Sequence, residues 1–298
     1  MHRFLAAVTA ALSLFFAFGL TLSGVSAQDA TPSPFANYPQ LNITITDSTV
    51  TLDQSTVPSG WISVNLTNNS SDESGVGLLA APEGQSLADL LASAATPTAD
   101  DDFPPFMYTS VIAGGPSGID PGGTGSQIVH LTEGDWAAFP EGQQTPAPFT
   151  VKTTADSMET PPTATATITM SNFLFAGWDQ LVVGQQTLAV TNKGDQPHML
   201  VFEQVPDGTT IDQLKAALGG DESGTPVTGG FDVTKVMPVP GGDVIMLSTN
   251  QTAYINVDLG AGTYVALCFV TDPATGKLHA MLGMASLFTV GSVATPTA

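Results

Sequence analysis

Short runs of strand-forming residues, separated by turn-forming residues, recur along almost the whole of this 298-residue chain. Examples are "ITITDSTVTL", "GWISVNLTN", "QTLAVTN", "HMLVFEQV" and "GTYVALCFV", with Gly, Asn, Asp and Pro between them. Runs of this length and spacing predict a β-sandwich or barrel and disfavour alternating strand–helix–strand units. We therefore expect an all-β protein.

Two stretches depart from this pattern and predict helices: "SLADLLASA" over 86–94 and "TIDQLKAAL" over 210–218. Each begins at a Ser or Thr and has an Asp near its first turn, which is typical of a helix start. Both halves of the chain share one order of features: strand, Asn-rich turn, strand, Pro-x-Gly and helix. The sequence thus predicts a tandem duplication of one β-sandwich, with a short helical insertion in each copy.

Segments rich in Thr, Pro and Ala separate these units, at 30–34, 158–166 and 293–298. Such composition is typical of extended, solvated linkers and tails. We therefore divide the chain into a signal peptide, a linker, a first domain, a second linker, a second domain and a tail, at 1–27, 28–39, 40–155, 156–166, 167–291 and 292–298.

The N-terminus carries Arg3, then an apolar run over 4–25, then "VSA" before a polar turn. This pattern indicates a secretory signal peptide that is cleaved after Ala27. The apolar run is also long enough to span a bilayer if it is not cleaved, so an N-terminal anchor is the alternative. No second stretch has that character, and we expect no membrane span after cleavage. The predicted location is secreted, periplasmic or cell-surface.

The formal net charge is −21, and beyond the signal the chain has five lysines and no arginine. Such a charge repels phosphate backbones, so the composition excludes nucleic acid as an expected partner. Two interpretations of the acidity stay open. It keeps the protein soluble, or it docks the protein onto a basic partner.

Cys268 is the only cysteine. Secreted domains usually carry cysteines in even numbers because they form disulfides, so a single one needs an explanation. An accessible thiol outside the cytoplasm is open to oxidation, whereas a thiol buried in apolar packing or bound to a metal is protected. Taken alone, Cys268 favours burial. Its neighbours in the sequence favour a metal.

Those neighbours are His279 and Met284, in "CFVTDPATGKLHAMLGM", and His198 follows a turn in the same half. Each of these residues singly is more typical of packing. Together, two imidazoles, a thiolate and a thioether suit a soft metal, and a trigonal His₂Cys site with a distant Met is the blue-copper arrangement. We interpret the nearby Met281 as a packing residue.

The first half lacks this set. It has Ser, Gly and Val over 74–77 where the second half has His198, and Pro140 where the second half has Cys268. His130 lies between Val and Leu in a predicted strand, and we interpret it as a structural or exposed histidine. We expect a first domain without metal ligands.

The second half resembles the cupredoxins, the family of plastocyanin and azurin. The resemblance rests on the Pro-His pair at His198, the "GTY" strand leading to Cys268, and "HAMLGM" before an "FTV" strand. It implies a Greek-key β-sandwich with one type 1 copper that alternates between Cu(I) and Cu(II). The implied ligands are His198, Cys268, His279 and Met284, and the implied exposed imidazole edge is that of His279. The first half resembles the family in architecture only.

Two features differ from the family. Ten residues separate Cys268 from His279, and their "TDPATGK" segment predicts a turn that folds outward and leaves His279 at the site. Met199 follows His198 where the family commonly has Asn, which predicts either a looser site or one better shielded from water.

We therefore predict a secreted blue copper protein that transfers single electrons between redox partners and is not an enzyme. Oxidases and nitrite reductases need several more histidines for their additional coppers, and only His130 remains beyond the signal. The alternative is a cell-envelope binding module of the same scaffold, metal-free or buffering copper. The redox partner is unidentified, and a basic protein would suit the charge.

Overall fold

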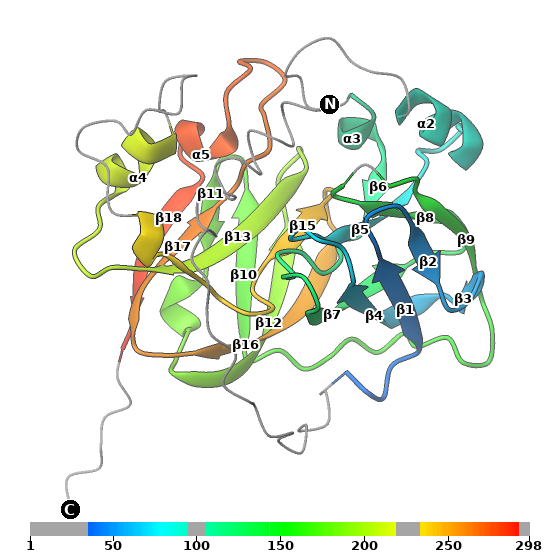
Figure 1. Cartoon of the computed structure of the whole chain (residues 1–298), viewed down its shortest axis with the longest axis horizontal. Coiled ribbons are helices and arrows are strands. Elements are labelled where there is room, and N and C mark those ends of the chain that lie inside the picture. The colour runs from blue at the N-terminus through cyan, green and yellow to red at the C-terminus, as the bar shows by residue number, and fades with distance from the viewer. Residues whose placement is uncertain (1–34, 95–104, 143, 219–232, 292–298) are drawn as a thin grey trace, which may run out of the picture.

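The computed structural model describes residues 35–94, 105–142, 144–218 and 233–291 (Figure 1). Within these ranges the chain is mostly β-strand with a few short helices, which confirms the predicted all-β class. The predicted signal peptide and C-terminal tail lie outside the described residues. No helix in the described part is long and apolar enough to cross a membrane.

One eight-stranded sheet runs through both halves of the chain, in the order β11-β10-β12-β16-β7-β4-β1-β2. The halves join where β16 pairs with β7, at Ala253↔Val129 and Tyr254↔Ile128. The strands are β11 (Leu174–Ala176), β10 (Ala166–Ser171), β12 (Gly184–Asn192), β16 (Thr252–Leu259), β7 (Thr124–Leu131), β4 (Gly60–Asn68), β1 (Gln40–Ile45) and β2 (Val50–Leu52).

Each half adds a five-stranded sheet of its own. In the first half the order is β3 (Thr56–Pro58), β9 (Ala147–Lys152), β8 (Gly134–Pro140), β5 (Val76–Ala80) and β6 (Val111–Ile112). In the second half, β18 (Ala285–Val290), β17 (Gly262–Leu267), β13 (His198–Val205) and β14 (Met237–Pro238) follow one another, and β15 (Val244–Leu247) also pairs with β13. The order of pairing is therefore repeated, while the division into two domains at 156–166 stays a prediction.

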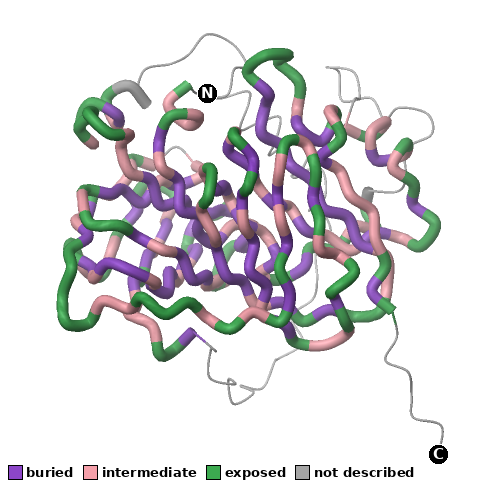
Figure 2. The backbone as a smooth tube through the Cα atoms, turned by 180° about the vertical axis from the view of Figure 1, so that it is seen from behind, coloured by how far each residue is buried: buried purple, intermediate pink, exposed green. Residues whose placement is uncertain are grey.

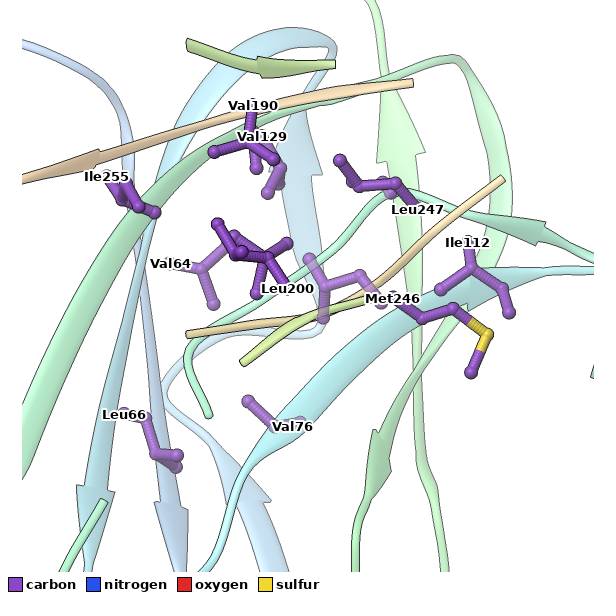
Figure 3. Close-up of a cluster of buried hydrophobic side chains, with 14 of the residues drawn as sticks. Val64, Leu66, Val76, Ile112, Val129, Val190, Leu200, Met246, Leu247 and Ile255 are labelled. Carbon is purple, nitrogen blue, oxygen red and sulfur yellow. The ribbon is translucent and has the colours of Figure 1, made fainter. Parts of the chain in front are cut away.

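The core lies between the large sheet and the two smaller ones and is continuous across the halves. In β1, Leu41, Ile43 and Ile45 are buried and alternate with residues that face solvent, as expected for a strand with one covered face. Figure 3 shows Val64 and Val129 of the first half close to residues of the second half such as Val190. Buried residues follow the strands and exposed ones gather in the turns (Figure 2). Both halves therefore share one hydrophobic interior.

The two predicted helices are present, as α2 (Leu87–Ala94) and α4 (Ile211–Leu218). The Ser86 and Thr210 hydroxyls each accept a free N–H group of the first helical turn, from Asp89 at 3.1 Å and from Gln213 at 3.2 Å. These bonds stabilise the helix starts. The short helices α3 (Phe106–Thr109) and α5 (His279–Leu282) lie at the same end of the molecule (Figure 1). Two 3₁₀ turns complete the list, η1 (Trp178–Gln180) and η2 (Val233–Lys235).

Part of the predicted linker at 156–166 is packed against the large sheet. The Met158 carbonyl accepts the N–H of Trp61 at 2.7 Å, and Met158 forms a bridge with Gly60. Glu159 lies 3.7 Å from His130 of β7, whose ring packs edge-on against Trp61. His130 is thus partly exposed and held by neighbours, as the sequence predicts.

Candidate metal centre

Two neighbouring strands of the second half bring His198 and Cys268 together. His198 is the first residue of β13, and Cys268 directly follows β17. The strands are antiparallel, with Val201 opposite Leu267, so the start of one lies beside the end of the other. His279 begins α5, and its N–H donates to the Val270 carbonyl at 2.8 Å, which returns the chain to the same point.

The ten residues between Cys268 and His279 form an outward hairpin, as the sequence predicts. Thr271 bridges Leu278 at its base, and the N–H of Asp272 donates to the Lys277 carbonyl at 2.8 Å. Gly276 supplies the positive φ that the turn needs, at 67°. The long interval therefore does not displace His279 from Cys268.

The three side chains converge on one small volume. The Nδ1 atoms of His198 and His279 are 3.0 Å apart, and Sγ of Cys268 lies 3.9 Å from the first and 3.5 Å from the second. All three residues are 0% exposed. Ligand atoms that each bind one ion at about 2.0–2.3 Å lie about 3–4 Å from one another. The spacing of this cluster therefore fits a single metal ion.

The outer nitrogens of both rings are fixed by amide oxygens. Nε2 of His198 lies 3.0 Å from Oδ1 of Asn172, and Nε2 of His279 lies 2.9 Å from Oε1 of Gln196. The amide NH₂ groups face carboxylates, because Asn172 donates to Asp195 and Gln196 donates to Asp272. Each oxygen must therefore accept a hydrogen from the imidazole, which places the ring proton on Nε2.

This tautomer leaves both Nδ1 atoms as lone pairs that face each other at 3.0 Å. Two acceptors this close repel one another unless a cation or a shared proton lies between them. The donor set of two neutral imidazoles and one thiol suits a soft transition metal such as copper. The residues present therefore fit the ion that the sequence predicts.

The pKa values of both imidazoles are lowered, so the rings are neutral near neutral pH. Burial lowers the pKa of His198 to about 3, helped by His279 and opposed by Asp195. Burial lowers the pKa of His279 to about 4, opposed by Asp272. Burial also raises the pKa of the Cys268 thiol to about 12, although backbone N–H groups favour the thiolate. A bound cation is what would deprotonate this thiol near neutral pH.

Comparison with known proteins finds only a distant likeness to solved structures. No protein-family model and no curated protein matches the sequence. Among solved structures, the chain is similar to reduced auracyanin from the photosynthetic bacterium Roseiflexus castenholzii, with 19% identity over 38% of this chain and 96% of that one, at a TM-score of 0.27. It is also similar to a multicopper oxidase, with 12% identity over 85% of this chain and 88% of that one, at a TM-score of 0.22. Scores this low assign neither a family nor a function.

The backbone of Met284 is hydrogen-bonded to that of Cys268 and His279. Its carbonyl accepts the N–H of Cys268 at 3.2 Å, and its own N–H donates to the His279 carbonyl at 2.9 Å. Its side chain is buried and belongs to the large core cluster. Ligation by the Met284 thioether stays a prediction. Met281 is 37% exposed on α5.

The exposed imidazole edge that the family resemblance implies for His279 is absent, so this expectation was wrong. The ring is fully buried, since Gln196 covers its Nε2 and Phe173 packs on it with ring centroids 4.8 Å apart. Sequence reasoning missed Asn172, Gln196 and Asp272. The available signal was the "GDQPH" turn, which places Gln196 two residues before His198.

Proposed function

We propose that this chain is a cupredoxin-type electron carrier that binds one copper ion through His198, Cys268 and His279, with Met284 as a weak fourth ligand. The observation that carries the proposal is the pair of Nδ1 lone pairs, 3.0 Å apart and beside the Cys268 sulfur in a fully buried site. Copper, when bound there, supplies a one-electron Cu(II)/Cu(I) couple.

The protein's own residues supply fixed geometry and a dry surrounding. Asn172 and Gln196 lock the two imidazole rings, and such outer partners keep ligand orientation the same in both oxidation states. The N–H of Met199 points at the Cys268 sulfur from 3.4 Å and stabilises negative charge on it. A site that need not rearrange favours rapid electron exchange.

We also propose a place and a partner for this activity. The signal-peptide pattern supports secretion to a periplasmic or cell-surface location, and the net charge of −21 supports docking onto a basic redox protein. Cell fractionation tests the first. The second predicts that electron transfer to a basic partner slows as salt rises, because screening weakens the attraction.

We do not propose an enzyme. Among the described residues, one group of His, Cys, Asp and Glu side chains is arranged to hold a metal ion, and it is this one. His130, which would be needed for a further copper, packs against Trp61 on the large sheet. Turnover of nitrite or phenols above the rate of free copper would overturn this interpretation.

The burial of both imidazoles favours a second candidate, copper storage or buffering by an envelope module. A fully covered site holds its ion well but gives a partner no direct contact with a ligand edge. The two candidates differ in redox behaviour. A carrier passes through repeated reduction and oxidation with its copper retained, whereas a buffer releases copper when it is reduced or challenged with a chelator.

Copper loading of the wild-type protein and of Cys268→Ser tests the proposal. We expect one copper per chain and an intense visible thiolate-to-copper band in the wild type, and loss of that band in the variant. His130→Ala is the matched control and should keep the band. A Cys268→Ser protein with undiminished colour would refute the ligand assignment, and a wild type that takes up no copper would leave a metal-free module.

A further inference from the structure

Gln196 is held at three points beside the candidate metal centre. Its Oε1 accepts from Nε2 of His279 at 2.9 Å, and its amide nitrogen donates to Oδ1 of Asp272 at 2.9 Å. Its backbone carbonyl accepts from the side chain of buried Asn192 at 2.7 Å. A glutamine in a turn is normally free to rotate, whereas this one has both ends of its amide occupied.

Asp272 is as firmly placed as Gln196. Its second carboxylate oxygen accepts from the Thr275 hydroxyl at 2.7 Å, and the residue is 4% exposed at the base of the hairpin. The adjoining Thr271 carbonyl accepts from the hydroxyl of Tyr108 on α3, which belongs to the first half. The hairpin that carries Asp272 is therefore tied to both halves of the molecule.

The hydrogen-bonded series Asp272–Gln196–His279 lies across the outer side of the His279 imidazole, where the family resemblance implies an open edge. Its direction is set by chemistry, because the carboxylate only accepts, the amide donates to it, and the amide oxygen then accepts from the ring. The carboxylate polarises the amide and strengthens its bond to the imidazole. We name this hydrogen-bonded series the Gln196–Asp272 clasp.

We propose that Gln196, oriented by Asp272, is a positioning residue that aims Nδ1 of His279 into the metal site and closes the imidazole from solvent and from redox reagents. This inference rests on the proposed function for its copper readouts. Loss of the clasp has two consequences: the ring gains rotational freedom and a second tautomer, and its outer edge becomes accessible. The first weakens metal binding and makes the site less rigid, which by itself slows electron exchange. The second lets small reagents contact the ring directly, and we expect this larger effect to raise the net exchange rate.

The main test compares Gln196→Ala with the wild type, both loaded with copper. We expect copper affinity to fall by about 10–100-fold, as for other outer partners of ligating histidines. We also expect a changed electron paramagnetic resonance spectrum and a larger second-order rate constant with small inorganic electron donors and acceptors. Asp272→Asn should stay close to the wild type, because its amide oxygen still accepts from Gln196, while Asp272→Ala should resemble Gln196→Ala.

Asp72→Ala is the matched control. The Asp72 carbonyl accepts from the side chain of Asn68 at 2.8 Å, as the Gln196 carbonyl accepts from Asn192, but Asp72 belongs to the half without ligands. We expect its copper affinity and exchange rate to be those of the wild type. If Gln196→Ala changes thermal stability but leaves affinity, spectrum and exchange rate at wild-type values, the residue is structural only and the proposal is overturned.

Metal-free protein separates this proposal from that of copper binding. Nitrogen-15 NMR of the wild type should show His279 as the Nε2–H tautomer with a slowly exchanging ring proton. Gln196→Ala should mix the tautomers and speed the exchange. A wild type that shows this signature but takes up no copper refutes the proposed function and keeps the clasp, and a wild type without the signature refutes the clasp.

Discussion

The corresponding strand ends of the two halves have the same backbone frame and different chemistry. Asn68 donates to the Asp72 and Ile119 carbonyls at 2.8 and 2.7 Å, and Asn192 donates to the Gln196 and Leu247 carbonyls at 2.7 and 2.8 Å. Each Asn closes the turn that leads to the next strand. The same frame therefore forms beside His198 in one half and beside Ser74 in the other.

The side chains that follow this frame differ. Ser74 stands at the position of His198, because Ser74 forms a bridge with Ile119 as His198 pairs with Leu247. Two residues further on, Val76 lies opposite Pro140, and the register that sets Val201 opposite Leu267 continues to Leu200 and Cys268. Pro140 thus occupies the position of Cys268. Glu141 then lies over Gly75, donating its N–H to the Gly75 carbonyl at 3.0 Å. One half presents two imidazoles and a thiol at this place, and the other presents the carboxyl of Glu141.

Gly194 allows the strongest test of this difference between the halves, because its counterpart Ser70 carries a side chain. The N–H groups of Gly194 and Ser70 donate alike to Asn192 and Asn68, at 2.8 and 2.9 Å. A Cβ at Gly194 would lie 2.6 Å from Nε2 of His198 and 2.3 Å from Oδ1 of Asn172. A side chain at position 194 would therefore collide with the ring of His198, and the first half has Ser74 in place of that ring.

We predict that Gly194→Ser lowers copper affinity by about 10–100-fold, because it separates His198 from the amide that orients it. Copper titration against a competing chelator measures the change. Ser70→Gly is the control, with wild-type affinity and a stability loss of about 1 kcal/mol from its lost hydroxyl bonds. Equal copper affinity in Gly194→Ser and wild type would show that His198 does not need Asn172.

The paired substitutions Asn68→Ala and Asn192→Ala sharpen the comparison further. Both side chains are 0% exposed and fully hydrogen-bonded, so each loss should reduce the free energy of unfolding of the metal-free protein by about 2–3 kcal/mol. Urea unfolding checks this. Only Asn192→Ala should also weaken copper binding, since Asn192 holds Gln196 and Gly194. An equal effect of the two variants on copper affinity would contradict the division of roles.

Much of this contrast was readable from the sequence. The alternation of apolar residues in runs such as "LNITI" predicted the strands, and Ser86 and Thr210 predicted the helix starts, because both are local signals. The residue types of His198, Cys268 and His279 predicted the donor set, and the structure brings these three together. Ligand chemistry depends on side-chain identity, which a sequence states outright.

Other features depend on contacts between distant segments. Asn172 meets His198 across a turn of the neighbouring sheet, and Tyr108 reaches Thr271 from the other half of the chain. Nothing local marks either residue. The same holds for the β16–β7 pairing, which joins one sheet from each half into a single eight-stranded sheet. An edge strand carries no sign of which edge it will join.

The last comparison concerns pH. Burial lowers the pKa of His198 and His279 in the second half and raises the pKa of Glu141 in the first half. It favours neutral imidazoles at one end and a neutral carboxyl at the other. Burial raises the pKa of Glu141 to about 7 from a usual 4.5, with Ser117 opposing the change and Glu73 adding to it. The same effect acts on two carboxyls of the second half, because burial raises the pKa of Glu203 to about 7 and also raises that of Asp243.

For Glu141 the folded state keeps its proton where the unfolded chain has lost it, between pH 4.5 and about 7. The unfolded state therefore binds fewer protons in this window, and the free energy of unfolding falls as pH rises through it. We predict that Glu141→Gln, which retains a polar group facing Ser117, raises stability above pH 7 by about 1–3 kcal/mol and leaves it unchanged below pH 4.5. Urea unfolding across pH measures this slope.

Exposed Glu83→Gln should follow the wild-type profile. A Glu141→Gln profile parallel to the wild type at every pH would mean that the carboxyl is ionised in the folded protein. The end of the first half would then hold a buried negative charge against Glu73, and its carboxyl would need a cation partner.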